Sequence, residues 1–365
     1  MATSTRTLHR FGQSLWLDNI TRGMLDDGTL ARYVADLSVT GLTSNPTIYN
    51  AAVKNTAFYD HAIAEKVGRG LTGERLFFEL AIEDLSRAAD TFRPVYDRSG
   101  GADGWVSLEV SPTLAYDTAS TLAAARDLHA RAGRPNLFIK IPGTAEGLPA
   151  IEEAIFAGVP VNVTLLFTRE HYLAAAEAYL RGIERRVDAG LSPRVCSVAS
   201  LFISRWDGAT AAALPADLAN TLGIAIGQQC YHAYRDLVAS DRFQRLANFG
   251  ALPQRLLYAS TGTKDPKLSD CLYVTALASP HTVNTMPEQT LLAFADHGDP
   301  GGLLSAGGGG AETTLAAIRR AGVNVEAVGA KLQRDGAEAF VKSWNELLEV
   351  IEKKSRTVAT AGAAR

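Results

Sequence analysis

The chain has 365 residues, of which 47% are hydrophobic and 21% are charged, and its formal net charge is −3. This composition is typical of a globular protein with a large buried core, and the length allows one large α/β domain or two smaller ones. The near-neutral charge and the lack of a dense basic stretch argue against a nucleic-acid partner, so small molecules are the expected partners.

Cysteine use and hydropathy bear on the cellular compartment. The three cysteines, Cys196, Cys230 and Cys271, lack paired spacing, which favours free thiols in a reducing cytosol. The N-terminal segment has no apolar signal core, and no apolar run is long enough to span a membrane. We therefore expect a cytoplasmic protein without a membrane segment. A monomer or homodimer is expected, although neither cysteine use nor hydropathy decides between the two.

Eight short strand-like runs recur along the chain, separated by helical patterns. In chain order they are 14–20, 37–46, 104–110, 136–142, 159–166, 195–202, 255–261 and 281–287. Strands that alternate with helices indicate parallel pairing through right-handed crossovers. After the fifth run, Thr168 predicts the N-cap of a helix that ends near Gly190.

Some connections are longer than a single crossover helix requires. Segment 47–103 is expected to hold two helices, 207–254 is helix-rich, and a glycine-rich loop at 300–312 precedes C-terminal helices. We expect a flexible tail at about 356–365. No repeat or linker divides the chain, so residues 1–365 are predicted to form a single domain with extra helices after strand 2, after strand 6 and at the C-terminus.

Polar residues alternate with apolar ones in several of the predicted strands. In the fourth run, Leu137, Ile139 and Ile141 alternate with Lys140. Side chains two positions apart share a face, so the apolar set can meet outer helices while the polar set faces a common interior. In an open doubly wound sheet both faces would be apolar. The pattern predicts a (β/α)8 barrel, with its site at the carboxyl ends of the strands.

Lys140 interrupts the apolar sequence NLFIKIPGT at 136–144. Burial disfavours the charged form of a lysine, so its presence there needs an explanation. One interpretation is a buried ion pair with Asp18 or Glu109. The other is a neutral amine that forms a Schiff base with a carbonyl substrate. That chemistry also needs acid and base groups, and Asp18, Glu109 and the Thr164 hydroxyl lie on the same predicted face.

Other motifs carry weaker signals. GRGLTG at 68–73 fits the dinucleotide-binding pattern, but no strand precedes it, so that function is disfavoured. STGTKDP at 260–266 either binds a sugar phosphate through backbone N–H groups and Lys264 or forms a plain turn. The histidines and cysteines show no metal-ligand spacing. We expect neither a metal nor a cofactor.

Seven separated motifs, spread over about residues 14–300, resemble the transaldolase family of Schiff-base transferases. They are WLDNITR (16–22), GLTSNPTIY (41–49), VSLEVSPTLAYD (106–117), LFIKIPGT (137–144), VNVTLLF (161–167), SLFISRW (200–206) and YASTGTKDP (258–266). The resemblance implies a (β/α)8 barrel with the Schiff-base lysine on the fourth strand, which is where Lys140 lies.

The resemblance also implies roles for individual residues. Asp18 is similar to the general acid/base at the substrate hydroxyl, while Glu109 and Thr164 resemble the pair that handles a catalytic water. The residues that it implies for substrate binding are Asn45, Asn162, Ser200, Phe202, Arg205, Ser260 and Lys264. An ASFR-like phosphate motif of some family members is replaced here by ASTGTK, which makes Lys264 the expected phosphate cation.

The implied reaction moves a dihydroxyacetone unit from sedoheptulose 7-phosphate or fructose 6-phosphate to glyceraldehyde 3-phosphate or erythrose 4-phosphate. A fructose-6-phosphate aldolase-like lyase is an alternative, but that branch tends to have an amide in place of Glu109 and a tyrosine in place of Phe202. A non-catalytic sugar-phosphate-binding barrel is a further alternative. It would be expected to lack at least one of Asp18, Glu109 and Lys140.

Overall fold

The computed structural model describes residues 3–363, and its centre is a closed barrel of eight parallel strands in the order β1 to β8. The strands are β1 Ser14–Leu17, β2 Val39–Leu42, β3 Val106–Glu109, β4 Leu137–Pro142, β5 Val161–Leu166, β6 Ser197–Phe202, β7 Arg255–Ala259 and β8 Val283–Met286. Each lies within one of the eight runs identified in the sequence. The predicted (β/α)8 barrel is therefore confirmed.

The register of the barrel sets the neighbours of Lys140. Glu109 on β3 lies opposite Lys140 on β4, and Lys140 lies opposite Asn162 on β5. Paired positions of neighbouring parallel strands point to the same side of the sheet. The polar set of the sequence pattern is therefore gathered in one layer inside the barrel.

Helices surround the barrel and fill the connections between its strands. Those up to β5 are α1 Ser4–Arg10, α2 Arg22–Asp26, α3 Thr29–Leu37, α4 Pro46–Asn55, α5 Asp60–Gly68, α6 Gly73–Arg98, the 3₁₀ turn Pro112–Leu114, α7 Thr118–Ala132 and α8 Gly147–Phe156. Those after β5 are α9 Arg169–Asp188, α10 Ser204–Thr210, α11 Leu222–Ala239, α12 Asp241–Asn248, α13 Leu272–Ala276, α14 Glu288–His297, α15 Ala311–Arg320 and α16 Val325–Ala363. Thr168 caps α9 by accepting a hydrogen bond from His171 N, as predicted.

One expectation for the connections was wrong. The segment between β2 and β3 holds three helices, α4, α5 and α6, where two were expected. Its GRGLTG sequence lies between α5 and α6, without a preceding strand. The C-terminal tail expected at about 356–365 overlaps the end of α16, which continues to Ala363; residues 364–365 lie outside the described chain. The flexibility of this tail stays a prediction.

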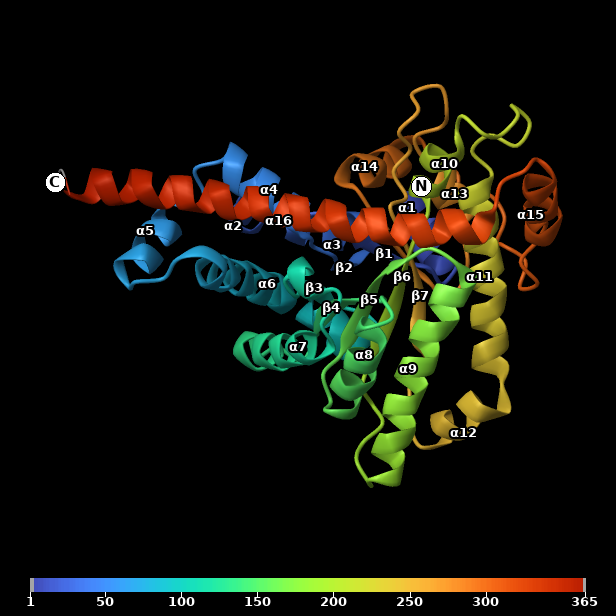
Figure 1. Cartoon of the computed structure of the whole chain (residues 1–365), viewed down its shortest axis with the longest axis horizontal. Helices are drawn as coiled ribbons and strands as arrows, with labels where there is room; N and C mark the ends of the chain where they lie inside the picture. Colours follow the sequence, from blue (N-terminus) through green and yellow to red (C-terminus); the bar gives the residue numbers. More distant parts are fainter. Residues whose placement is uncertain (1–2, 364–365) are drawn as a thin grey trace.

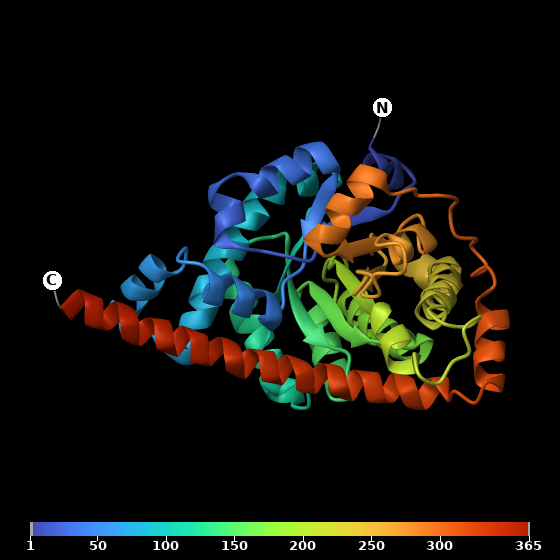
Figure 2. The same cartoon turned by 90° about the horizontal axis from the view of Figure 1, so that it is seen from above.

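Helix α16 crosses the whole length of the molecule and lies over the barrel and α4 (Figure 1, red). Figure 2 shows that its C-terminal half extends beyond the barrel towards α5. Trp344 packs edge-on against Phe77 of α6 at 5.0 Å between ring centroids. Lys354 donates hydrogen bonds to Thr56 O at 2.6 Å and to Asp60 Oδ1 at 2.5 Å. The helix is thus fixed to the segment between β2 and β3.

Two glycines allow α16 to approach the mouth of the barrel. A Cβ atom at Gly329 would lie 2.3 Å from Thr168 Cγ2 and 3.0 Å from Trp206, and one at Gly336 would lie 3.0 Å from Leu165 Cδ2. These distances are shorter than van der Waals contact. Small residues at these positions therefore bring the helix onto the carboxyl ends of β5 and β6.

We predict that Gly329→Ala destabilises the protein, although alanine normally favours a helix. Overpacking against Thr168 and Trp206 should lower the free energy of unfolding by about 1–3 kcal/mol. The control is Gly208→Ala in α10, where a Cβ would meet nothing within 4 Å. There the change should raise stability by about 0.5–1 kcal/mol. Urea unfolding measures both, and an equal gain in the two variants would contradict close packing of α16.

Candidate active site

A cavity of about 420 Å³ opens at the carboxyl ends of the strands. The residues from the sequence prediction that line it are Asp18, Asn45, Lys140, Thr164, Ser200, Phe202, Arg205, Ser260 and Lys264. They come from six of the strands or from the segments that follow them. Glu109 and Asn162 are also buried nearby but do not line this cavity. The barrel thus brings the predicted residues together at the face expected for a barrel enzyme.

Lys140 lies at the base of the cavity and only 5% of it is exposed. Its Nζ donates a hydrogen bond to Ser44 O at 3.2 Å and lies 3.4 Å from Glu109 Oε2. The ion pair that was one interpretation of this lysine is therefore present. This ion pair is also compatible with a Schiff-base lysine, because the Glu109 carboxylate is a proton acceptor next to the Lys140 amine.

Glu109 is buried, and desolvation raises the pKa of its carboxyl group to about 7 even though Lys140 acts in the opposite direction. Neither carboxylate oxygen has an aligned hydrogen-bond donor in the described part of the chain, and the same holds for Thr164 Oγ1. Buried polar oxygens without a protein partner are ones that water or a ligand can satisfy. Their strands, β3 and β5, flank the strand of Lys140.

Asp18 follows β1 and lies on the other side of the cavity from β5. The Thr43 hydroxyl donates to Asp18 Oδ1 at 2.7 Å. Burial raises the pKa of Asp18, against the opposing effects of the Lys140 charge and this hydrogen bond. Two carboxyl groups with raised pKa values thus lie in the field of one lysine. Perturbed groups of this kind in a cleft are typical of acid–base sites.

The two amides occupy different environments. Asn45 lines the cavity, and its Oδ1 also accepts a hydrogen bond from Ile48 N at 3.0 Å, which caps α4. Asn162 donates to Ser107 Oγ at 3.1 Å, and its Oδ1 accepts from Ser200 Oγ at 2.7 Å. Asn162 therefore supports Ser200, which lines the cavity. A direct contact between Asn162 and substrate stays a prediction.

Arg205 lines the cavity without an acidic partner among residues 3–363. Its guanidinium carbon lies 5.1 Å from the centre of the Phe202 ring and 5.8 Å from that of Phe340. Burial lowers the pKa of Arg205. A partly desolvated cation between aromatic rings has unused N–H donors and is suited to an anion.

The segment after β7 forms the neighbouring part of the cavity wall. Ser260 adopts a left-handed backbone conformation with φ of 56°, and its hydroxyl lies 2.8 Å from that of Ser204. Lys264 lines the cavity from an exposed position further along the same segment. The segment therefore adds a second cation on the side of Arg205.

Phe340 of α16 is a cavity residue that the sequence reasoning missed. Its ring centre lies 5.7 Å from Lys140 Nζ. Gln333 lies seven residues earlier in the same helix, and its side-chain amide donates hydrogen bonds to Gly143 O and Leu165 O, both at 3.0 Å. No sequence pattern links this region to Lys140. Only the tertiary packing of α16 brings an aromatic side chain onto the lysine.

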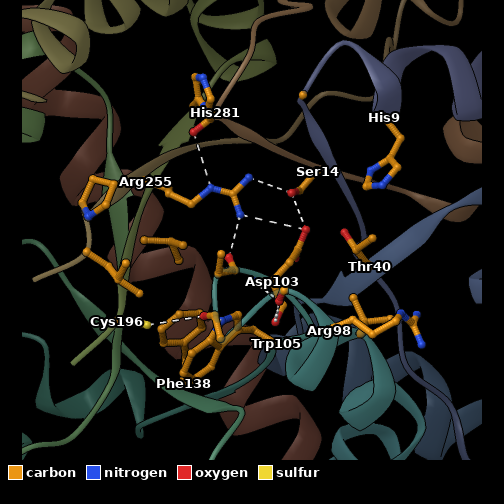
Figure 3. Close-up of a pocket in the computed structure, with 18 of the residues that line it drawn as sticks. His9, Ser14, Thr40, Arg98, Asp103, Trp105, Phe138, Cys196, Arg255 and His281 are labelled. Carbon is orange, nitrogen blue, oxygen red and sulfur yellow. Dashed lines mark hydrogen bonds and ion pairs between the residues drawn. The ribbon is translucent and has the colours of Figure 1, made fainter. Parts of the chain in front are cut away.

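A larger cavity of about 610 Å³ lies at the amino ends of the strands (Figure 3). Arg255 occupies its centre and donates to Ser14 Oγ at 2.6 Å, Ala102 O at 2.9 Å and Thr282 O at 2.8 Å. These hydrogen bonds of the Arg255 guanidinium connect the amino ends of β1 and β8 to the segment between β2 and β3. No residue of the sequence-predicted site lines this cavity. Its position and contacts fit a role in stability.

The fold and the smaller cavity define a (β/α)8 barrel with a lysine-centred polar site at its carboxyl mouth, an arrangement suited to Schiff-base enzymes. Residues 15–351 match the family described as Transaldolase/Fructose-6-phosphate aldolase. The chain belongs to this family.

Curated relatives agree with this assignment. The chain is 44% identical over 350 residues to the transaldolase of Saccharopolyspora erythraea, covering 94% of this chain and 95% of the relative. It is 43% identical to the transaldolase of Arthrobacter sp., covering 96% and 97%, and 43% identical to that of Thermobifida fusca, covering 97% and 99%. No helix in residues 3–363 has the length and apolarity needed to cross a bilayer.

The raised pKa of Glu109 predicts a specific pH dependence of stability. The folded protein keeps this proton up to about pH 7, whereas an unfolded chain releases it near 4.5. Between these values the native state binds more protons, so stability should fall as pH rises. Glu109→Gln should make this decline shallower, and the part that remains is the part expected from the raised pKa of Asp18. Urea unfolding of both proteins across this range measures it, and parallel stability curves would contradict the raised pKa.

Proposed function

We propose that the chain is a transaldolase that transfers a dihydroxyacetone unit between sugar phosphates through a Schiff base on Lys140. The observation that carries the proposal is the buried Lys140–Glu109 pair, 3.4 Å between Nζ and Oε2, with Asp18 close enough for the Lys140 charge to act on its pKa. The family assignment and the relatives named transaldolase support it. The reaction needs neither a metal nor a cofactor.

In the proposed mechanism, the Lys140 amine attacks the ketose carbonyl, and the resulting carbinolamine loses water to form an iminium ion. Glu109, with a pKa of about 7, can both give and take a proton near neutral pH. With Thr164 it would activate the water that leaves and later returns. Glu109 Oε1 and Thr164 Oγ1, buried oxygens without an aligned hydrogen bond within the described chain, suit this role.

Asp18 would then take the proton of the hydroxyl next to the bond that breaks. The carbon–carbon bond cleaves, the electron pair passes into the iminium, and an aldose phosphate leaves. The remaining carbanion attacks an acceptor aldehyde, Asp18 returns the proton, and water releases the new ketose from Lys140. Asp18 lies close enough to Lys140 for the lysine charge to act on its pKa.

Arg205 and Lys264 would hold the terminal phosphate of each donor and acceptor in turn. Arg205 lacks an acidic partner in the described chain and is partly buried, so its N–H groups are available. Because the phosphate lies far from the reacting carbons, its binding energy can orient them. The remaining polar cavity residues, Asn45, Ser200 and Ser260, would hold sugar hydroxyls.

Two residues favour transfer over aldolase-type release. Glu109 is a carboxylate where the aldolase branch tends to have an amide, and Phe202 stacks on Phe167 at 5.3 Å where that branch tends to have a tyrosine. A binding protein without catalysis would have no need of the Asp18, Glu109 and Lys140 set. We also propose a cytoplasmic location, in keeping with the three free cysteines, and a monomer or homodimer.

Borohydride reduction tests the covalent step. With fructose 6-phosphate, we expect the reduced adduct on the peptide that contains Lys140, because this amine lies inside the cavity. Lys140→Ala and Lys140→Arg should lose both the adduct and transfer, since neither side chain is a usable nucleophile. Lys267→Ala, an exposed lysine that does not line the cavity, is the matched control and should keep the adduct. Label on Lys264 alone, or on no lysine, would exclude the mechanism. Free dihydroxyacetone released faster than it is transferred would point to an aldolase.

A comparison of acceptors tests the phosphate site. Arg205→Ala should lower kcat/KM strongly for glyceraldehyde 3-phosphate, because the phosphate loses its main cation. For unphosphorylated glyceraldehyde, which has no group for this subsite, the loss should be much smaller. Rates for both acceptors in both proteins give the ratio directly. Equal losses would show that Arg205 serves the fold or the chemistry instead.

A further inference from the structure

Three potential metal ligands meet at a surface site outside the catalytic cavity. Asp270 and Cys271 lie at the end of the segment that joins β7 to α13, and His297 is the last residue of α14. Among the described residues, theirs is the one group of three or more histidine, cysteine or acidic side chains with ligand atoms all within 4.8 Å of one another. None of the three lines the catalytic cavity.

The donor set has the chemistry of a zinc site. Thiolate, imidazole and carboxylate are the ligands that Zn²⁺ uses in proteins, and sites with three protein ligands add water as the fourth. Ligand atoms in a tetrahedral zinc site are roughly 3–4 Å apart, given bonds of about 2.0–2.3 Å. His297 Nε2 already lies 3.0 Å from Asp270 Oδ1. Small side-chain rotations would therefore complete the geometry.

A second carboxylate orients the histidine. Asp296 Oδ2 lies 3.2 Å from His297 Nδ1, the ring nitrogen that faces away from Asp270. Metal-bound histidines almost always donate their other N–H to a carboxylate or carbonyl, which fixes the tautomer. The Cys271 side chain is buried, whereas Asp270 and His297 are exposed, so an ion can enter from solvent.

We propose that Cys271, His297 and Asp270 bind a Zn²⁺-type transition metal that clamps the β7–α13 segment to the end of α14. The ion would replace the proton of the Cys271 thiol and release it to solvent. The clamped segment contains Ser260 and Lys264, while the start of α14 supplies Gln289 and Thr290 to the same cavity. The metal would therefore fix the far end of the wall that carries Lys264, without taking part in the reaction at Lys140.

Cobalt(II) titration of the reduced, metal-free full chain tests the site. We expect saturable binding of about one ion per chain, with a thiolate-to-cobalt charge-transfer band that Zn²⁺ abolishes by displacement. Cys271→Ser should lose the band, whereas the matched control Cys230→Ser should keep it. Asp296→Asn should weaken binding about 10–100-fold, the usual effect of removing a carboxylate that orients a metal-bound histidine.

The competing explanation is a metal-free cluster in which protonated His297 bridges Asp270 and Asp296. It predicts no charge-transfer band, and that outcome would overturn the proposal, as would a band that survives Cys271→Ser. The clamp is tested by trypsin cleavage after Lys267, which Zn²⁺ should slow in wild type but not in Cys271→Ser. Equal cleavage rates in wild type with and without bound Zn²⁺ would overturn the clamp. Borohydride labelling of Lys140 should persist in every variant and confirm folding.

Discussion

The buried pair of Lys140 and Glu109 is the constraint on which the site depends. Parallel pairing of β3 with β4 puts the two residues in opposite positions inside the barrel, so any shift in register would separate them. A buried ionisable pair contributes little net stability, and loss of one partner from a charged buried pair typically costs about 3–5 kcal/mol. The pair is thus a poor choice for stability alone, but it supplies what amine catalysis needs: a nucleophile with a proton acceptor in contact.

Burial gives the neighbouring groups their acid–base properties. Desolvation raises the pKa values of both Glu109 and Asp18, while Lys140 limits each shift. Helix α16 contributes to this burial, because its Phe340 ring lies 5.7 Å from Lys140 Nζ and lines the cavity. Gly329 and Gly336 permit this close approach. A helix outside the strand pattern therefore adds to the apolar surroundings of a site built from strands.

The two ends of the barrel serve different purposes. At the amino ends, the Arg255 guanidinium at the centre of the larger cavity is engaged with backbone carbonyls and Ser14. At the carboxyl ends, Arg205 has only aromatic neighbours and can accept an anionic ligand. The two central arginines distinguish the cavities better than the cavity volumes do: the N–H groups of Arg255 are bonded to protein oxygens, whereas those of Arg205 are available to a ligand. The proposed metal clamp would act on the second cavity from outside, through the segment that carries Lys264.

The strand pattern of the sequence determined the eight strands and the polar layer inside the barrel, because a strand has a period of two and a parallel barrel brings all its carboxyl strand ends to one face. The resemblance of the sequence motifs to the transaldolase family added the residues expected to bind substrate, and with these the sequence indicated nine of the 21 residues that line the cavity. Tertiary structure alone decided which contacts these residues make. It placed Phe340 on Lys140, turned Asn162 towards Ser107 and Ser200, and brought His297 to Cys271. These contacts join segments distant in the chain, and they depend on helix packing and on loop paths that no local periodicity encodes.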